Sequence, residues 1–353
     1  MIVDGKHIRS VWCENGTVRI INQTILPHRF EIFECPDHQR TTRAILNSIV
    51  RGAGATGTAA AYAVAQAALE APEKDFIPYI DEAVRELKDT KKTLRTLFYC
   101  ADKVYNKIKR SQNPEIAKKA AMLEADSLAE ADVAACMKIG KIGAALLHDG
   151  TRVLTHGYAG WLAATDWGTA LSPVYTAKRD GKNIFVFIDE SRPTFHGARL
   201  NAWELGEEDI EYALIADAAS GYFMQKKEVD IVVVGAERIA GNGDVAARIG
   251  TYEKAVLAKA NKIPFYVAAP IWTIDEECRT GKDIELRDRD EDELLKITGR
   301  DEVNSIRTIT VVPEKTHARN PVFDITPSKY VTSFITEQGI FSPDQIKSKY
   351  LKK

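Results

Sequence analysis

The chain has 353 residues, of which 45% are hydrophobic and 28% charged, and its formal net charge is -2. This composition is typical of a globular protein with two domains, or with one large domain and an accessory module. The near-neutral charge gives no electrostatic basis for binding nucleic acid or an anionic membrane, and no stretch approaches the roughly 20 apolar residues of a membrane span.

The N-terminal part is predicted to be mainly helical after a short hairpin. The start, MIVDGKHIRS, lacks the features of a signal peptide, so we expect a cytoplasmic protein. Apolar runs within residues 8–23 flank Asn15-Gly16, a strong turn pair. Helical patterns follow at about 36–50, 55–69, 76–87, 92–109 and 114–147. We expect an N-terminal domain over residues 1–123 and a connecting helix over residues 124–150.

From residue 151 the pattern changes to apolar strands separated by helical stretches, with another Ala- and Leu-rich helix predicted after Tyr158. The predicted strands are 152–155, 184–189, 212–216, 230–235 and 264–268. Continuous apolar runs with helix-length connections predict a Rossmann-like, doubly wound parallel sheet over residues 151–353. The fold class is therefore α/β. The polar stretch 275–296 is interpreted as an exposed loop and helix start.

The cysteines favour neither a disulfide framework nor a structural zinc site. They are odd in number, widely spaced and contain no CxxC pair. Most are expected to be small buried residues in a reducing compartment. They are Cys13, Cys35, Cys100, Cys136 and Cys278.

Two segments are candidates for binding an anion or moving a proton. The stretch 51-RGAGATG-57 places an arginine and three glycines at the start of a helix, which suits a phosphate but equally suits a tight, closely packed turn. Glu237 follows a predicted strand and is a candidate general acid or base if burial raises its pKa. The alternatives are an ion pair of Glu237 or Asp244 with a nearby arginine, or Asp244 as a helix N-cap.

Ligands bind beyond the carboxyl ends of the strands in such a sheet. The segment 189–205 places Asp189, Glu190, Arg192, His196 and Arg199 at one of these ends. We expect one or two of them to reach a ligand and the others to fix the loop or a subunit contact. His156, at another strand end, is interpreted as hydrogen-bonded structure without a recognisable partner in the sequence.

Together these motifs resemble the methylthioribose-1-phosphate isomerases. Their wider superfamily includes ribose-1,5-bisphosphate isomerase and the alpha, beta and delta regulatory subunits of translation initiation factor 2B. The similarity runs nearly end to end. It includes 51-RGAGATG-57, 154-LTHGYAG-160, 190-ESRPTFHGARLNAWEL-205, 233-VVGAERIAGNGDVAARIGTY-252, 264-PFYVAAPIWTID-275 and 320-NPVFDITP-327.

The resemblance implies a helical N-terminal domain on a Rossmann-like domain, a homodimer, and no metal or nicotinamide cofactor. It implies the conversion of an aldose 1-phosphate into a ketose 1-phosphate. In this reaction the ring oxygen is protonated and hydrogen moves from C2 to C1. A cysteine and an aspartate form the catalytic pair usually assigned.

This sequence departs from the family pattern at the expected substrate pocket. Gly157 and Tyr158 stand where the motif LTHCNAG has cysteine and asparagine, and Glu237 stands in place of the aspartate. His196 replaces a glutamine, and Ala247-Arg248 replaces Asn-Lys. Arg51, Gly52 and Ala53 still match the phosphate loop, while Lys91 aligns with a segment near the phosphate. We therefore expect a phosphorylated ligand bound by Arg51, Gly52, Ala53, Lys91, Ala247 and Arg248.

Three hypotheses remain open. The first is an isomerase for methylthioribose 1-phosphate or a related pentose 1-phosphate, with Glu237 as the acid or base and His196 or Tyr158 as a second proton-transfer group. The second is a related isomerase with a changed substrate. The third is a non-catalytic sensor of sugar phosphates or nucleotides that resembles the initiation factor 2B regulatory subunits.

Overall fold

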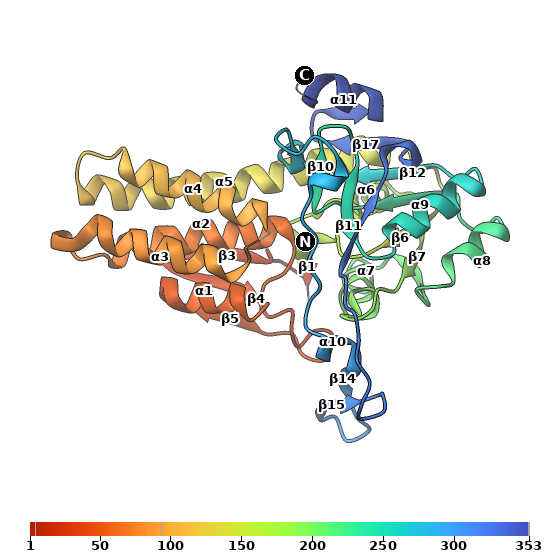
Figure 1. The fold of residues 1–353 in the computed structure, drawn as a ribbon, viewed down its shortest axis with the longest axis horizontal. Helices are drawn as coiled ribbons and strands as arrows, with labels where there is room; N and C mark the ends of the chain where they lie inside the picture. Colours follow the sequence, from red (N-terminus) through yellow and green to blue (C-terminus); the bar gives the residue numbers. More distant parts are fainter. Residues whose placement is uncertain (4, 93, 352–353) are drawn as a thin grey trace.

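The structure is a computed structural model that describes residues 1–3, 5–92 and 94–351. A helical region and a region built on a parallel sheet lie side by side, and α5 (Pro114–Ala144) runs between them (Figure 1). The predicted C-terminal domain ends at residue 353, and its last two residues lie outside the described ones. The domain limits at 123/124 and 150/151 stay predictions.

The predicted N-terminal hairpin is confirmed. Strand β3 (Val11–Glu14) pairs antiparallel with β4 (Thr17–Ile21), and the turn between them has positive φ at Asn15 and Gly16. A two-residue hairpin turn of the primed type needs this backbone conformation. Strand β5 (Ile32–Cys35) extends the sheet beside β4, and β1 (Ile2–Val3) pairs with β2 (Lys6–His7) at the start of the chain.

The helical region surrounds one alanine-rich helix, α2 (Ala53–Glu70). Its side chains from Ala55 to Ala68 are buried, because it packs against the neighbouring helices on several sides. Small side chains permit this close approach. The start of α2 is thereby held at the boundary with the sheet region. The other helices here are α1 (His38–Leu46), α3 (Phe76–Thr90) and α4 (Arg95–Lys109).

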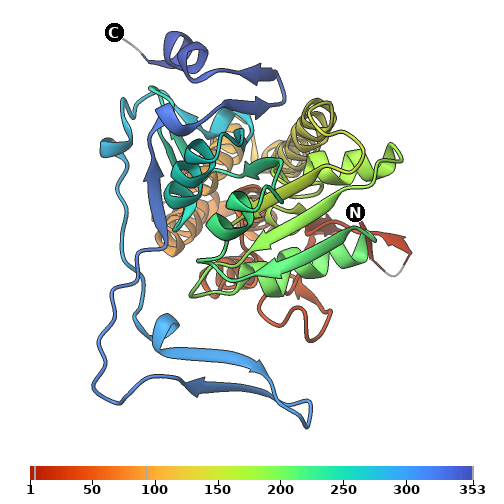
Figure 2. The same ribbon diagram turned by 90° about the vertical axis from the view of Figure 1, so that its right-hand side faces the viewer.

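The α/β fold class is confirmed. The seven-stranded sheet has the order β18-β17-β12-β9-β6-β7-β8, and its strands run parallel except for β18. Figure 2 shows helices on both sides of this sheet. The five predicted strands correspond to β6 (Arg152–His156), β7 (Phe185–Asp189), β8 (Glu211–Ile215), β9 (Ile231–Val234) and β12 (Phe265–Ala268), and the edge adds β17 (Ser333–Thr336) and β18 (Gly339–Phe341). The helices that follow or connect them are α6 (Ser172–Arg179), α7 (Ala202–Glu207), α8 (Ser220–Gln225), α9 (Thr251–Ala260) and α11 (Pro343–Tyr350).

The helix predicted after Tyr158 is wrong. Only a short 3-10 turn, η2 (Trp161–Ala163), forms before the chain continues irregularly to α6. Two buried carboxylates explain the loop. Glu204 accepts hydrogen bonds from the backbone of η2, and Asp132 accepts one from the backbone N–H of Thr165 at 2.7 Å. Backbone donors that a helix would use internally are satisfied by these side chains instead.

Two further features were not predicted. A helix alone was expected between β9 and β12, but β10 (Arg238–Ala240) and β11 (Val245–Arg248) come first and join β13 (Ile274–Asp275) and β16 (Phe323–Thr326) in a second sheet. A hairpin of β14 (Lys296–Arg300) and β15 (Ile306–Thr310) follows α10 (Asp292–Leu295) and projects from the body (Figures 1 and 2). In the described part of the chain, no helix combines the length and apolarity required to cross a membrane.

Candidate functional site

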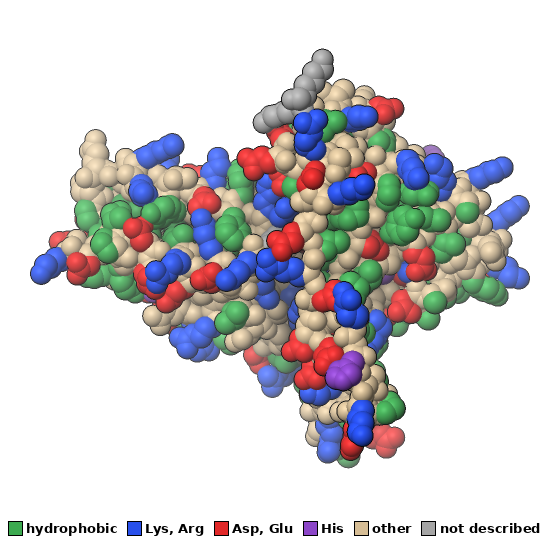
Figure 3. Space-filling model, viewed as in Figure 1, with side chains coloured by type: hydrophobic (Ala, Val, Ile, Leu, Met, Phe, Trp, Pro, Cys, Tyr) green, Lys and Arg blue, Asp and Glu red, His purple; other side chains and the backbone are tan. Residues whose placement is uncertain are grey.

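A cavity of about 400 Å³ lies where the start of α2 meets the carboxyl ends of β6 and β9. On the face in Figure 3, Lys and Arg side chains gather between the helical region and the sheet region. The ten residues that the family resemblance marks as site positions all line this cavity, although their roles stay predictions. These residues are Arg51, Gly52, Ala53, Lys91, Gly157, Tyr158, His196, Glu237, Ala247 and Arg248.

The glycine loop opens α2 toward the cavity. Gly52 is the N-cap residue with φ +87°, and a Cβ there would lie 2.3 Å from the backbone of Ala163. A side chain at this position would therefore clash. The backbone N–H groups of Ala53 and Gly54 belong to the first turn, where a helix has no internal acceptors. Both residues line the cavity, so the helix start presents hydrogen-bond donors and a positive dipole to a bound anion.

Arg51, Lys91, Arg248 and Arg289, here named the cation cluster, surround the same space. Burial, together with repulsion by Arg289 and other arginines, lowers the pKa of Arg51 and of Arg248 to about 10. The same causes lower the pKa of Lys91 to about 8. Within the described residues, neither Arg51, Lys91 nor Arg248 has a carboxylate within ion-pair distance. Arg289 pairs with Glu293, and Glu293 and Glu237 offset part of the charge of the cluster, but the other three members have no direct carboxylate partner.

Arg289 is the member that the sequence reasoning missed. It belongs to residues 285–289, which are exposed and also line the cavity. The interpretation of the stretch 275–296 as an exposed loop and helix start therefore fits these residues, but it did not include a contact with the cavity. Arg289 forms an ion pair with Glu293 one helical turn further on. The surrounding segment is rich in both signs of charge, which is typical of a solvated surface. Arg287 and Arg289 both line the cavity, and no local pattern distinguishes them from the other charged residues of the segment.

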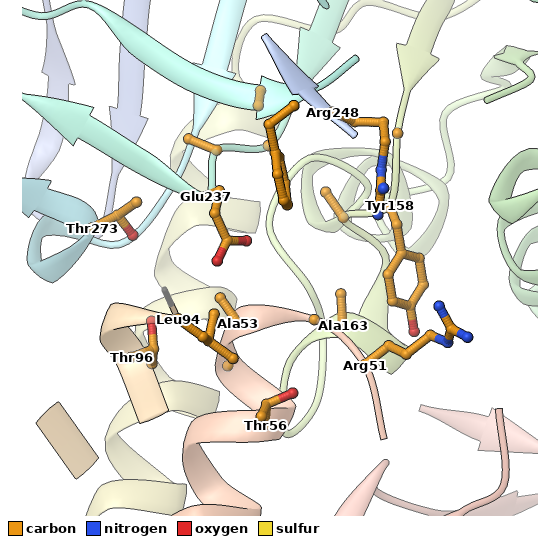
Figure 4. Close-up of a pocket in the computed structure, with 18 of the residues that line it drawn as sticks. Arg51, Ala53, Thr56, Leu94, Thr96, Tyr158, Ala163, Glu237, Arg248 and Thr273 are labelled. Atoms are coloured by element: carbon orange, nitrogen blue, oxygen red, sulfur yellow. The ribbon is translucent and has the colours of Figure 1, made fainter. Parts of the chain in front are cut away.

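Glu237 lies at the opposite side of the cavity from Arg51 and Tyr158 (Figure 4). Antiparallel pairing of β10 with β11 places it near Arg248, because the N–H of Glu237 donates to the carbonyl of Ala246 at 2.9 Å. Burial raises the pKa of Glu237, while Arg248 and Arg238 oppose this effect. Among the described residues, no group hydrogen-bonds to its carboxylate. The arrangement leaves a protonatable group free to face a ligand.

Gly157 and Arg248 are adjacent across the cavity wall. Gly157 has φ +83°, and a Cβ added to it would lie 2.9 Å from Cβ of Arg248. Nδ2 of Asn201 donates to the carbonyl of Gly157 at 2.9 Å and fixes the turn. No cysteine is found among the described residues that line the cavity, and burial raises the pKa of the Cys100 thiol, which lies behind α2, to about 12.

His196 and Tyr158 pack together with ring centroids 5.0 Å apart. Nη2 of Arg248 lies 3.3 Å from Nδ1 of His196, and burial with nearby arginines holds the pKa of His196 well below its usual range. The hydroxyl of Tyr158 donates to Oε1 of Gln23 at 3.0 Å, and burial raises its pKa well above the ordinary value. Both side chains are therefore neutral at physiological pH.

Directly behind the cavity lies a second group of charges, here named the paired cluster: His156, Asp189 and Lys254. The Asp189 carboxylate lies 2.7 Å from Nδ1 of His156 and 3.0 Å from Nζ of Lys254, and all three side chains are buried. The interpretation of His156 as hydrogen-bonded structure is confirmed. The partner not recognised from the sequence is Asp189, which the parallel register of β6 and β7 brings opposite His156.

The other charged residues of segment 189–199 fix loops, as expected. Glu190 accepts hydrogen bonds from the backbone N–H groups of Gly197 and Ala198, and Arg199 donates to carbonyls near Leu26. Only His196 of this group lines the cavity.

The N-cap interpretation of Asp244 is wrong. Asp244 accepts hydrogen bonds from the backbone of Gly281 and Ser328, and α9 begins seven residues later at Thr251. Nor does the described part of the chain contain a group of three or more His, Cys, Asp or Glu side chains arranged to hold a metal ion.

The chain is similar to known proteins in both sequence and structure. Residues 49–343 match the initiation factor 2 subunit family. The chain is 42% identical over 334 residues to the methylthioribose-1-phosphate isomerase of Acetivibrio thermocellus, covering 93% of this chain and 95% of that protein. The structure of 5-methylthioribose 1-phosphate isomerase from Pyrococcus horikoshii OT3 is 35% identical, with a TM-score of 0.87 over 98% of this chain and 95% of that one. The structure of translation initiation factor eIF-2B, subunit delta, from A. fulgidus is 39% identical, with a TM-score of 0.84 over 97% and 100%.

Proposed function

The chain belongs to the initiation factor 2 subunit family, and from that premise we propose that it is an aldose–ketose isomerase for a pentose 1-phosphate. Methylthioribose 1-phosphate is the first substrate to test, since relatives about 40% identical over nearly the whole chain bear the name methylthioribose-1-phosphate isomerase. The active site that we propose is divergent, with Gly157 and Glu237 where the family motif has cysteine and aspartate.

The observation that carries this proposal is the polarity of the cavity. In this proposal the cation cluster and the start of α2 hold the phosphate, and Glu237, which lies across the cavity from Arg51 (Figure 4), faces the sugar. Arg51 and Lys91 supply charge-assisted hydrogen bonds, which are stronger than neutral ones. Gly52 and Ala53 place backbone atoms against the phosphate, and Ala247 leaves room beside Arg248. A phosphate bound there fixes the sugar ring relative to Glu237.

Glu237 is the proposed acid and base. Its raised pKa favours the protonated carboxyl in the free site, so it donates a proton to the ring oxygen as the bond from that oxygen to C1 breaks. Hydrogen then moves from C2 to C1 with its electron pair, the Glu237 carboxylate takes the proton of the C2 hydroxyl, and a ketose 1-phosphate results. Burial of the cavity shields the open-chain intermediate from water.

A second, adjoining cavity of about 320 Å³ gives space for the far end of the sugar. It shares Thr96, Glu237, Trp272 and Thr273 with the first cavity and adds Tyr99 and Ile271 to the wall. Its wall is mixed, with Arg95, Glu276 and Glu277 beside Tyr99, Ile271 and Trp272, so the cavity offers space without selecting the substituent at C5.

The test combines binding and turnover in the same samples. Purified protein is incubated with methylthioribose 1-phosphate, ribose 1-phosphate and ribose 1,5-bisphosphate, with calorimetry for binding and NMR for ketose product. We expect turnover of at least one sugar, lowered about 10²- to 10⁴-fold in Glu237→Gln. Glu115→Gln, an exposed carboxylate in the first turn of α5, serves as the control. Turnover that survives in Glu237→Gln would remove Glu237 from the mechanism.

The alternative is a non-catalytic, sugar-phosphate- or nucleotide-binding regulatory protein. It is favoured by the likeness to the protein named translation initiation factor eIF-2B, subunit delta, at 39% identity. Binding of a sugar phosphate or nucleotide without product from any of the three sugars would support this alternative over the isomerase.

We also propose a homodimer, to be checked by sedimentation equilibrium. A monomer at micromolar concentration would contradict it.

A further inference from the structure

We infer that Gly157, Arg248 and His196 form one unit in which Arg248 fixes the tautomer of His196, leaving its Nε2–H as a hydrogen-bond donor inside the cavity. This inference rests on the proposed function only for the identity of the ligand. In that function, an oxygen of the open-chain sugar phosphate accepts the hydrogen bond from Nε2–H. Arg248 acts here as a positioning residue for the His196 imidazole, in addition to contributing positive charge to the cavity.

The tautomer follows from the contact between the two side chains. Nη2 of Arg248 lies 3.3 Å from Nδ1 of His196. A guanidinium has only donors, so Nδ1 must be the acceptor and carry a lone pair. In a neutral imidazole the proton then resides on Nε2. The cations nearest to the ring, Arg248 and Arg51, oppose a second proton, as does its burial.

Nε2 is a donor without an acceptor. Among the described residues it has no hydrogen-bond partner, although His196 is only 2% exposed and lines the cavity. Leaving a buried donor unsatisfied costs free energy, which is recovered when a ligand oxygen accepts from it. Because Nε2 already carries the proton and Nδ1 is engaged, His196 cannot accept a proton from the substrate. It stabilises developing negative charge on oxygen while keeping its proton.

Tyr158 does not compete for this role. Its hydroxyl proton is directed to Gln23, and the Gln23 amide in turn donates to the carbonyl of Leu162 at 2.8 Å. The Tyr158 ring packs on His196 and restricts the imidazole to one orientation. Of the two candidates for the second polar group, the geometry therefore selects His196.

A glycine is required at position 157 to leave room for the Arg248 side chain. A Cβ at Gly157 would stand 2.9 Å from Cβ and 3.6 Å from Cγ of Arg248, and the φ of +83° disfavours any side chain. A cysteine placed at this position would displace Arg248 and release His196. Gly157→Cys is thus expected to damage this site, because its side chain would occupy the space that Arg248 fills.

The first experiment reads the tautomer directly. NMR of protein labelled with ¹⁵N at histidine distinguishes Nδ1–H from Nε2–H, and the His196 signals are assigned by their loss in His196→Gln. We expect a neutral, Nε2-protonated ring between pH 6 and 8 that becomes a tautomer mixture in Arg248→Met. The control is Arg152→Met, which removes an exposed arginine paired with Asp230. Protonation at Nδ1, titration of His196 in this range, or an unchanged tautomer in Arg248→Met would overturn the inference.

The second experiment tests Gly157 with a matched glycine. Gly157→Ala should produce the same change in the His196 signals as Arg248→Met. Gly181→Ala introduces the same backbone strain, at φ +82°, where a Cβ meets no atom within 4 Å. An unchanged His196 signal in folded Gly157→Ala would contradict the coupling. If that variant does not fold, Arg248→Met still decides the tautomer claim.

The third experiment concerns the ligand. We expect the Kd for methylthioribose 1-phosphate to rise about tenfold in His196→Ala and less in His196→Gln, whose amide retains an N–H donor. Equal loss in both variants would contradict the donor role. These readouts are separate from turnover: a wild-type protein that binds without product would refute the isomerase and leave the tautomer result standing.

Discussion

Two groups of charged side chains, one buried and one lining the cavity, lie next to each other in this protein and are built in opposite ways. In the paired cluster, the Asp189 carboxylate lies between His156 and Lys254, and a second carboxylate, Asp324, stands close to both cations. In the cation cluster, Arg51, Lys91 and Arg248 repel one another and have no carboxylate partner among the described residues. Charged side chains that ion-pair partners neutralise stabilise the fold. Charged side chains without an ion-pair partner are available to bind an anion.

The two groups are also connected. Nε2 of His156 lies 2.8 Å from the carbonyl of Ile249, and the Thr251 hydroxyl donates to the carbonyl of Arg248 at 2.6 Å. Both contacts hold the turn that follows β11, from which Arg248 enters the cavity. The paired cluster therefore supports the position of one member of the cation cluster. The comparison predicts that a substitution in the paired cluster lowers the stability of the fold, whereas a substitution in the cation cluster lowers the affinity for the phosphorylated ligand.

Removing the central carboxylate should have the largest effect. We expect Asp189→Asn to lower the free energy of unfolding by about 3–5 kcal/mol, because it removes the carboxylate that lies between the buried His156 and Lys254 side chains. Urea unfolding measures this change. The control is Asp230→Asn, which breaks the exposed pair with Arg152 and should cost about 1 kcal/mol or less. If Asp189→Asn lowers the free energy of unfolding no more than Asp230→Asn does, the paired cluster does not stabilise the fold.

Arg51→Met should act in the opposite direction on stability. We expect the Kd for methylthioribose 1-phosphate to rise about 10- to 100-fold, since a charge-assisted contact to the phosphate is lost. The free energy of unfolding should rise by about 1 kcal/mol, because a buried cation without a carboxylate partner is removed. Calorimetry and urea unfolding of the same variant measure both. A variant less stable than wild type would contradict the view that Arg51 is held for a ligand.

The comparison also explains how much the sequence could predict. Local apolar runs predict strands such as β9, and local glycines predict the start of α2. The sheet, the fold class and the cavity residues near strand ends could therefore be predicted from the sequence. The pairing of His156 with Asp189 was not, because it depends on the register of two strands 33 positions apart. Arg289 and the irregular loop at Trp161 depend on tertiary contacts with residues far away in the sequence, and no local pattern contains them.

The smallest expected effect is a pH dependence of affinity that originates in Lys91. Its pKa is lowered to about 8 by burial and by repulsion from Arg289 and Arg51. A bound phosphate restores the usual preference for the charged amine, so binding takes up a proton above pH 8. The Kd for methylthioribose 1-phosphate should therefore rise about tenfold between pH 7 and 9. Calorimetry in buffers of different ionisation enthalpy measures both the Kd and the proton uptake.

Lys91→Met separates this effect from the rest of the cluster. The variant should bind more weakly at pH 7 but show little change from pH 7 to 9, since Arg51 and Arg248 titrate near pH 10 and stay charged in this range. The same lowered pKa has the reverse sign for folding. Between about pH 8 and the ordinary value of 10.5, the unfolded chain binds more protons at Lys91 than the folded chain, so this residue makes the free protein more stable as pH rises. Affinity and stability that change in the same direction over this interval would contradict the assignment of Lys91 to the cation cluster.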